Sequence, residues 1–131
     1  MSDRSAIYYL STKQPIGPIV MLTTAGFWRI KSGSRYCQIV DGGRCVTDGS
    51  GDYGDNEYCE VEVLRSLIMT TQEYDVEPIN DFVTVKGIKY KQDNRYNDGV
   101  GPSNVVIQEC DKWTWKSDYV TRRAGFKICG R

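Results

Sequence analysis

The sequence contains no histidine, so the side chains that could act in catalysis or metal binding are mainly carboxylates and cysteines. Histidine is the commonest general base and zinc ligand, so its absence removes the Ser/His and Cys/His nucleophilic arrangements. Paired carboxylates could still act as an acid and a base, as they do in glycosidases. We therefore expect a protein that is not an enzyme, and a carboxylate-based glycosidase is the catalytic alternative.

The overall charge excludes another class of function. The 17 basic residues balance the 17 acidic residues, so no broad positive field exists that would draw the chain to nucleic acid. No run of about 20 apolar residues occurs, and we expect no membrane span. The first residues are too polar for a signal peptide. An oxidised protein would therefore have lost its targeting segment, or would be a fragment of a longer chain.

Cysteines are the second group, and there are five of them. They are Cys37, Cys45, Cys59, Cys110 and Cys129. No C-x-x-C pair occurs, so neither a zinc ribbon nor a thioredoxin-like motif is supported. Wide spacing in a strand-rich chain favours disulfides, with one thiol left over, and predicts an extracytoplasmic location. That location would be secreted or an oxidising organelle lumen such as a thylakoid lumen; five buried, reduced thiols in a cytosolic protein are the alternative.

Short alternating apolar and polar runs indicate a chain built from β-strands. The runs cover residues 27–30, 60–63, 67–71, 82–85, 105–107, 113–115 and 126–128. Gly, Asp and Asn cluster between them at 41–43, 48–56 and 97–104, as expected of turns. Many short strands with regular turns predict an all-β sandwich or barrel over residues 26–131. We interpret Trp113 and Trp115, which share one face of a strand, as core residues; a stacking platform is the alternative.

Residues 1–25 differ from the rest of the chain. Pro15, Gly17 and Pro18 interrupt any regular helix or central strand. Apolar clusters at 7–10 and 19–22 are unusual for a free polar tail. We interpret this segment as an extended N-terminal arm that lies along its own domain or a neighbour, with an entirely disordered tail as the alternative.

Three segments, taken in order, resemble the CUB domain family. They are CVTDGSGDYGDNEYC at 45–59, YDVEPINDFVTVKG at 74–87 and WKSDYVTRRAGFKIC at 115–129. The first lacks the family's Ser-Pro-Asn-Tyr-Pro motif, and the short second segment is most similar to compact CUB-like modules of algal and other protist proteins. The resemblance covers residues 27–129. It implies a jelly-roll-like sandwich of two mostly antiparallel sheets.

The resemblance also implies a calcium site. Glu77, Asp81 and Asp118 stand at the family's acidic ligand positions, and the backbone carbonyl of Tyr119 would supply a further oxygen. Tyr53 matches the tyrosine whose hydroxyl supports the glutamate. Calcium prefers such oxygen ligands, and a cation would relieve the repulsion between converging carboxylates. The alternative is that these acids only cap turns or lie on the surface.

Disulfide pairing has several solutions, since five cysteines allow fifteen choices of two bridges. We prefer Cys45–Cys59, which would close a loop of 13 residues and add roughly 3 kcal/mol. Cys37–Cys129 would then tie the first strands to the last, leaving Cys110 as a buried thiol or an intermolecular link. The family's usual first bridge offers the rival pairing Cys37–Cys59.

The function that we expect is therefore a non-enzymatic interaction module that recognises protein or carbohydrate, with calcium at the acidic site. In many family members a basic residue of the partner inserts among these acids. The alternative is a structural accessory subunit, clamped by residues 1–25 into a larger assembly such as a photosynthetic or other lumenal complex. A glycosidase using Glu77 with Asp81 or Asp118 would need a deep cleft, which small sandwiches seldom offer.

Overall fold

The structure is a computed structural model of the 131-residue chain, and it describes residues 26–91 and 101–131. The predicted arm at 1–25 lies outside the described residues, as does part of the predicted turn at 97–104. The described ranges contain ten strands and no helix. The strands are β1 (Trp28–Ser32), β2 (Gln38–Val40), β3 (Cys45–Thr47), β4 (Tyr58–Val63), β5 (Leu67–Asp75), β6 (Phe82–Val85), β7 (Ile88–Tyr90), β8 (Val105–Ile107), β9 (Lys112–Lys116) and β10 (Gly125–Gly130).

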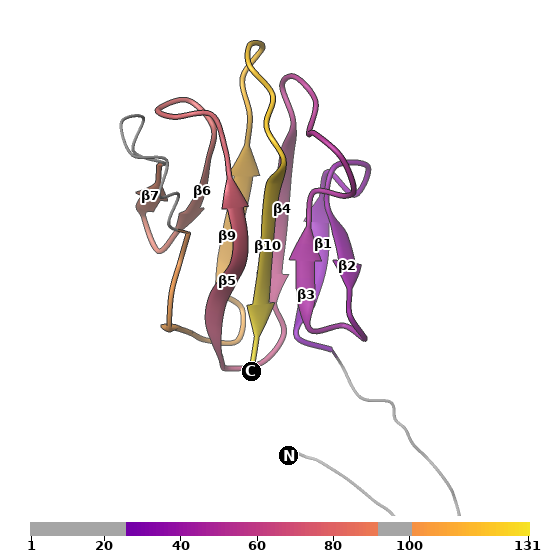
Figure 1. Cartoon of the computed structure of the whole chain (residues 1–131). Coiled ribbons are helices and arrows are strands. Elements are labelled where there is room, and N and C mark those ends of the chain that lie inside the picture. The colour runs from indigo at the N-terminus through magenta and orange to yellow at the C-terminus, as the bar shows by residue number, and fades with distance from the viewer. Residues whose placement is uncertain (1–25, 92–100) are drawn as a thin grey trace, which may run out of the picture.

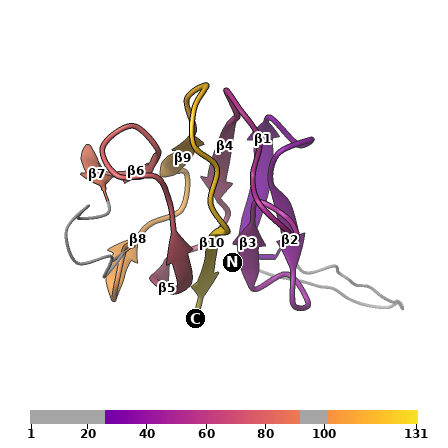
Figure 2. The same ribbon diagram turned by 45° about the horizontal axis from the view of Figure 1, so that its top comes forward.

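The strands form two five-stranded sheets that face each other as a β-sandwich (Figure 1). The first sheet has the order β1-β4-β9-β6-β7, and the second has the order β2-β3-β10-β5-β8. Every pairing is antiparallel. Figure 2, turned from the first view, shows β7 and β8 together at one side of the sandwich and β1 and β2 at the other. The predicted all-β sandwich is confirmed.

All seven runs of alternating residues predicted from the sequence overlap strands. Three strands were not predicted, namely β2, β3 and β7, and each has only three residues. Two of them, β2 and β7, lie at sheet edges and are half-buried at most. An edge strand of three residues needs only one partner and buries little surface. Its alternation of apolar and polar residues is therefore too short to recognise in the sequence.

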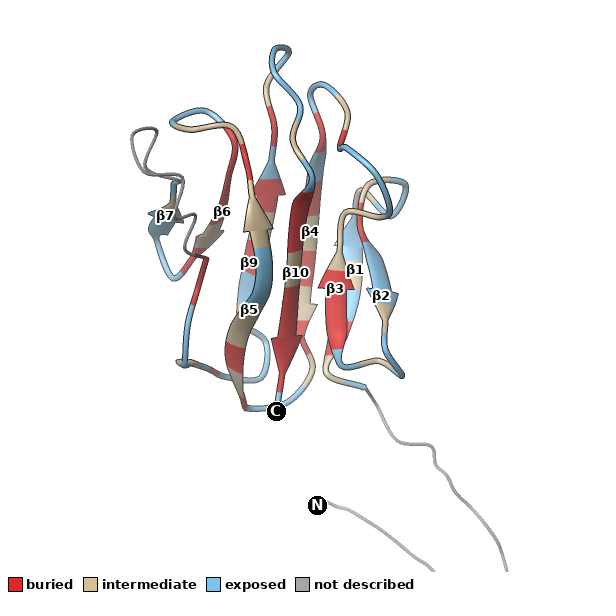
Figure 3. Ribbon diagram, in the orientation of Figure 1, coloured by how far each residue is buried: buried red, intermediate tan, exposed pale blue. Residues whose placement is uncertain are grey.

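The core lies between the facing sheets, and Figure 3 shows buried residues on strands of both sheets. Trp113 and Trp115 are 1% and 0% exposed, which confirms them as core residues. The Trp113 ring packs edge-on against Trp28, and Phe126 of the opposite sheet contacts both tryptophans of β9. Large rings from both sheets therefore fill the space between them, in the edge-to-face arrangement that aromatic rings favour.

The four cysteines predicted to be bridged are bridged, but the preferred pairing is wrong. The disulfides are Cys37–Cys59 and Cys45–Cys129. Cys59 on β4 is bonded to Cys37, which immediately precedes β2 of the facing sheet. Cys45 instead faces Cys129 directly across the β3–β10 ladder, with a Cα–Cα distance of 4.0 Å. The rival pairing Cys37–Cys59 is confirmed.

Cys110 is a free thiol on the surface, so the buried-thiol alternative is wrong. An intermolecular bridge through it stays a prediction. Two disulfides are compatible with an oxidising, extracytoplasmic environment, since such bonds persist there and are rare in the cytosol. Within residues 26–91 and 101–131, no helix could cross a membrane.

Candidate metal centre

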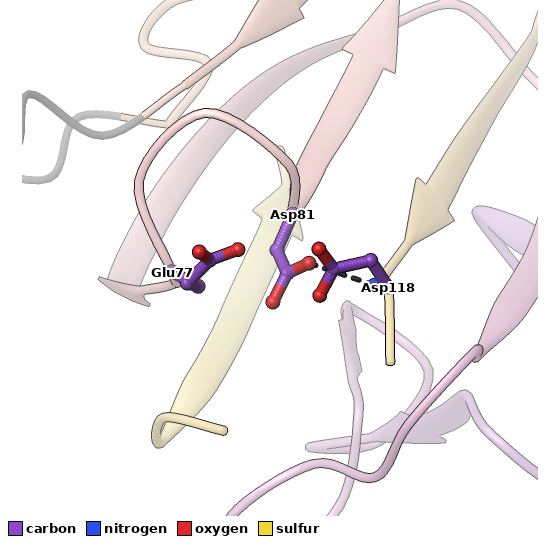
Figure 4. A group of neighbouring side chains, drawn as sticks. All are labelled: Glu77, Asp81 and Asp118. Atoms are coloured by element: carbon purple, nitrogen blue, oxygen red, sulfur yellow. Dashed lines mark hydrogen bonds between the residues drawn. The ribbon is translucent and has the colours of Figure 1, made fainter. Parts of the chain in front are cut away.

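Three acidic side chains from two loops meet at one end of the sandwich. Glu77 lies in the loop after β5, Asp81 immediately precedes β6, and Asp118 follows β9. One carboxylate oxygen from each lies within 4.8 Å of the others. Figure 4 shows the side chains turned toward one another. This convergence follows from topology, because β6 and β9 are antiparallel neighbours and Phe82 faces Lys116 across their ladder.

Asp81 is the centre of this group and is 0% exposed. The Tyr53 hydroxyl donates a hydrogen bond to its Oδ2 at 2.6 Å. The Asp118 backbone N–H donates to its Oδ1 at 2.8 Å (Figure 4). One carboxylate therefore ties together the β3–β4, β5–β6 and β9–β10 loops.

Tyr53 performs a different task from the one expected. Its hydroxyl does not support the Glu77 carboxylate; it donates to Asp81 and accepts a hydrogen bond from the Glu77 backbone N–H at 2.8 Å. The expectation was wrong because the fully buried Asp81 carboxylate accepts the hydrogen bond from the hydroxyl, whereas Glu77 meets Tyr53 only through its backbone N–H. Tyr53 is buried, and its ring packs edge-on against Trp115 at 4.9 Å. A core contact therefore fixes the position of the hydroxyl.

One oxygen of Glu77 has no hydrogen-bond partner among the described residues. This atom, Oε1, is buried. An acceptor in that position is costly unless a donor or a cation satisfies it. Asp118 accepts a hydrogen bond from the Val120 N–H at 3.1 Å and is only half-buried. Tyr119, whose carbonyl was expected to be a ligand, has a 72% exposed side chain; the carbonyl ligand stays a prediction.

Burial and neighbouring negative charges raise the pKa of two of the three acids. Burial, followed by the charges of Asp118 and Asp81, raises the pKa of Glu77. Burial also raises the pKa of Asp81, although the Tyr53 hydroxyl and the Asp118 amide oppose that shift. Burial and the bond to Asp81 raise the pKa of Tyr53, so the hydroxyl keeps its proton and donates it. Among the described residues, no lysine or arginine forms an ion pair with the three carboxylates.

This donor set could hold a metal ion. Three carboxylates offer hard oxygen ligands, and one of them, Glu77, has a buried oxygen that accepts no hydrogen bond from the described residues. Oxygen-only sites of this kind suit Ca²⁺ or Mg²⁺ better than zinc, which takes nitrogen or sulfur ligands in most sites. The Tyr53 hydroxyl and the Asp118 amide would orient Asp81 toward the ion, as outer partners commonly do.

Sequence reasoning missed two further acids at this end of the molecule, one buried and one half-buried. Glu57 is 7% exposed, and its carboxylate accepts hydrogen bonds from the Gly54 N–H at 2.6 Å and the Trp115 indole at 3.1 Å. Asp48 accepts one from the Phe126 N–H at 2.8 Å, and its other oxygen is buried without a partner. One signal was available in the sequence: a core tryptophan needs an acceptor for its N–H.

Comparisons with known proteins add no identification. No family model, no curated protein and no solved structure matches the chain significantly. The CUB-domain assignment therefore stays a prediction that depends on the quoted motifs.

Proposed function

We propose that this chain is a non-enzymatic, CUB-like interaction module whose acidic end binds Ca²⁺. The observation that carries the proposal is the approach of three carboxylates to within 4.8 Å without a basic partner among the described residues. Such a cluster is stable at neutral pH only if a cation is bound or one group keeps a proton. Calcium suits the site because it accepts six to eight oxygens in flexible geometry, and loops can supply the remainder as carbonyls or waters.

The surroundings of the site favour a protein partner. Exposed apolar side chains adjoin the acids in the sequence: Ile79 (55% exposed), Tyr119 (72%) and Val120 (43%). A lysine or arginine of a partner could place its charged group near the carboxylates and its aliphatic stem against these residues. Catalysis is disfavoured because Asp81 is fully buried, and both of its oxygens already accept hydrogen bonds.

Calcium binding is tested by thermal unfolding of the oxidised protein. Calcium at a hundred-fold excess over its Kd should add about 2.7 kcal/mol, which raises Tm by roughly 10 °C for a domain of this size. Asp118→Ala should abolish the rise. Asp52→Ala is the matched control, since this exposed acid lies outside the cluster. An unchanged Tm in calcium, or an equal loss in both variants, contradicts the site.

Recognition of a basic side chain is tested separately by NMR. A ¹⁵N-labelled sample is titrated with a short peptide containing lysine, and then with the same peptide containing norleucine. We expect shifts of the Asp118 and Tyr119 amides with the lysine peptide only, and only in calcium. Equal shifts with norleucine, or shifts that survive chelation, argue against this mode of binding.

A further inference from the structure

The outer face of the first sheet carries a compact group of lysines around one aromatic ring. Lys89, Lys91 and Lys116 place their Nζ atoms 5.2, 5.4 and 5.7 Å from the centre of the Phe82 ring. They come from β7, from the residue after β7, and from β9, on either side of β6. Phe82 is not part of the core cluster, yet it is only 9% exposed. The lysine side chains therefore cover it.

The strand register explains how these residues meet. Phe82 faces Lys116 across the β6–β9 ladder, and Thr84 faces Lys89 across β6–β7. Lys91 follows Tyr90, which faces Val83, so one further step along the ladder brings Lys91 opposite Phe82. Side chains of directly opposite residues lie on the same face of a sheet. The arrangement is thus fixed by the backbone.

No acid within residues 26–91 and 101–131 neutralises these three positive charges. None of the three lysines forms an ion pair with an acid in the described part of the chain. Attraction of the ammonium groups to the ring is weak at exposed sites and does not neutralise their charge. The acids of this face, Glu60 and Glu62, lie on β4, which is next to β9 and two strands away from β6. A gathered, unneutralised group of ammonium ions is a ready site for an anion.

An exposed aromatic residue extends the same row. Tyr58 faces Lys116 across the β4–β9 ladder and is 47% exposed. The row Tyr58–Lys116–Phe82–Lys91 crosses three strand spacings, or about 14 Å. Its aromatic end can pack against the apolar face of a sugar ring, while its basic end can bind anionic groups. That length suits a short oligosaccharide.

We propose that this row, together with Lys89, binds a sulfated glycan. A sulfate ester presents several oxygens to the three converging ammonium groups, and Tyr58 stacks on a neighbouring sugar. A flat anionic membrane fits less well, because it would also press against Glu60 and Glu62. The two disulfides are compatible with an extracytoplasmic setting, where glycans of this kind are exposed. Phe82 follows Asp81 directly and Lys116 lies two residues before Asp118, so this site adjoins the acidic end and is tested without calcium to separate the two proposals.

The test is binding of a size-defined heparin hexasaccharide to the oxidised full chain, measured by calorimetry in EDTA. We expect Lys89→Gln/Lys91→Gln/Lys116→Gln to weaken binding about ten-fold or more, because three charge-assisted contacts are lost. A control triple, Lys31→Gln/Lys112→Gln/Arg44→Gln, removes the same charge from exposed positions outside the cluster. It should change affinity less than about three-fold if only general attraction is altered.

Three further arms make the result decisive. Replacing the cluster lysines by arginine should keep binding, which guards against a folding defect in the glutamine triple. Tyr58→Ala should weaken the hexasaccharide but leave inorganic sulfate unaffected. The N- and O-desulfated hexasaccharide should bind much more weakly than its sulfated form. Equal losses in the cluster and control triples, equal binding of the desulfated sugar, or stronger binding to phosphatidylserine vesicles through the same lysines would overturn the proposal.

Discussion

Replacing Asp48 by asparagine should stabilise the protein above neutral pH. Burial of this carboxyl raises its pKa from 3.8 to about 7, against the lowering effect of the hydrogen bond from Phe126. The folded protein therefore holds a proton that the unfolded chain releases near its ordinary pKa. The stabilisation that this bound proton gives the folded state is fully present below pH 3.8. It is lost as the pH rises through about 7.

The magnitude follows from the size of the shift. Between about pH 5 and pH 8 the raised pKa corresponds to at most about 3 kcal/mol of unfolding free energy. Half-burial leaves some solvent screening, so we expect roughly 1.5 kcal/mol. Asparagine stays uncharged and can keep its carbonyl acceptor for the Phe126 amide, so the Asp48→Asn variant should lack this part of the pH dependence.

The assay is urea unfolding of both proteins at the two pH values, without calcium. The wild-type protein should lose more stability than Asp48→Asn as the pH rises, by the amount given above. Asp52→Asn, an exposed acid of the same loop, should behave like the wild type. If Asp48→Asn and the wild type show the same change in unfolding free energy between the two pH values, the carboxyl is not held protonated by burial and the reasoning is refuted.

Two further predictions concern the backbone and the disulfides. Gly125→Ala should cost roughly 3 kcal/mol or more, because the φ of Gly125 is +103° and a Cβ would lie 2.1 Å from Asp48 Oδ1. Gly87→Ala, at φ +80° with open space around it, should cost only roughly 1–2 kcal/mol in chemical unfolding. Trypsin leaves Cys45 and Cys59 on one peptide, so non-reducing mass spectrometry should find three peptides joined covalently. A two-peptide species beside a single internally bridged peptide would contradict the observed pairing.

The fold was predictable where burial and alternation agree over several residues. Strands β4 and β9 alternate inward and outward side chains over their whole length, as in Val61 and Trp113, and this periodicity is visible in the sequence. The partners of each strand were not predictable, since neighbours such as β3 and β10 are far apart in the chain. The pairing of the disulfides depends on those partners, which explains why the preferred bridges were wrong.

The sequence predicted which acids form the candidate site, but it did not predict the hydrogen bonds between them and their neighbours. Motif resemblance brought Glu77, Asp81 and Asp118 together, and the structure places them in one group. The hydrogen bonds within it depend on how deeply each side chain sits, which no motif encodes. Tyr53 therefore turned out to bond Asp81, and the unsatisfied oxygen of Glu77 became visible only in three dimensions. The lysines around Phe82 were equally hidden, because their convergence arises from strand register.

The position of β10 has a consequence for how the protein is made. This strand joins β3 to β5 in the middle of the second sheet, although it follows every other strand in the chain. Until residues 125–130 have left the ribosome or the translocation channel, β3 and β5 have no common neighbour, and Cys45 has no partner. During synthesis the unpaired edges of β3 and β5 are therefore exposed to aggregation until β10 pairs with both of them.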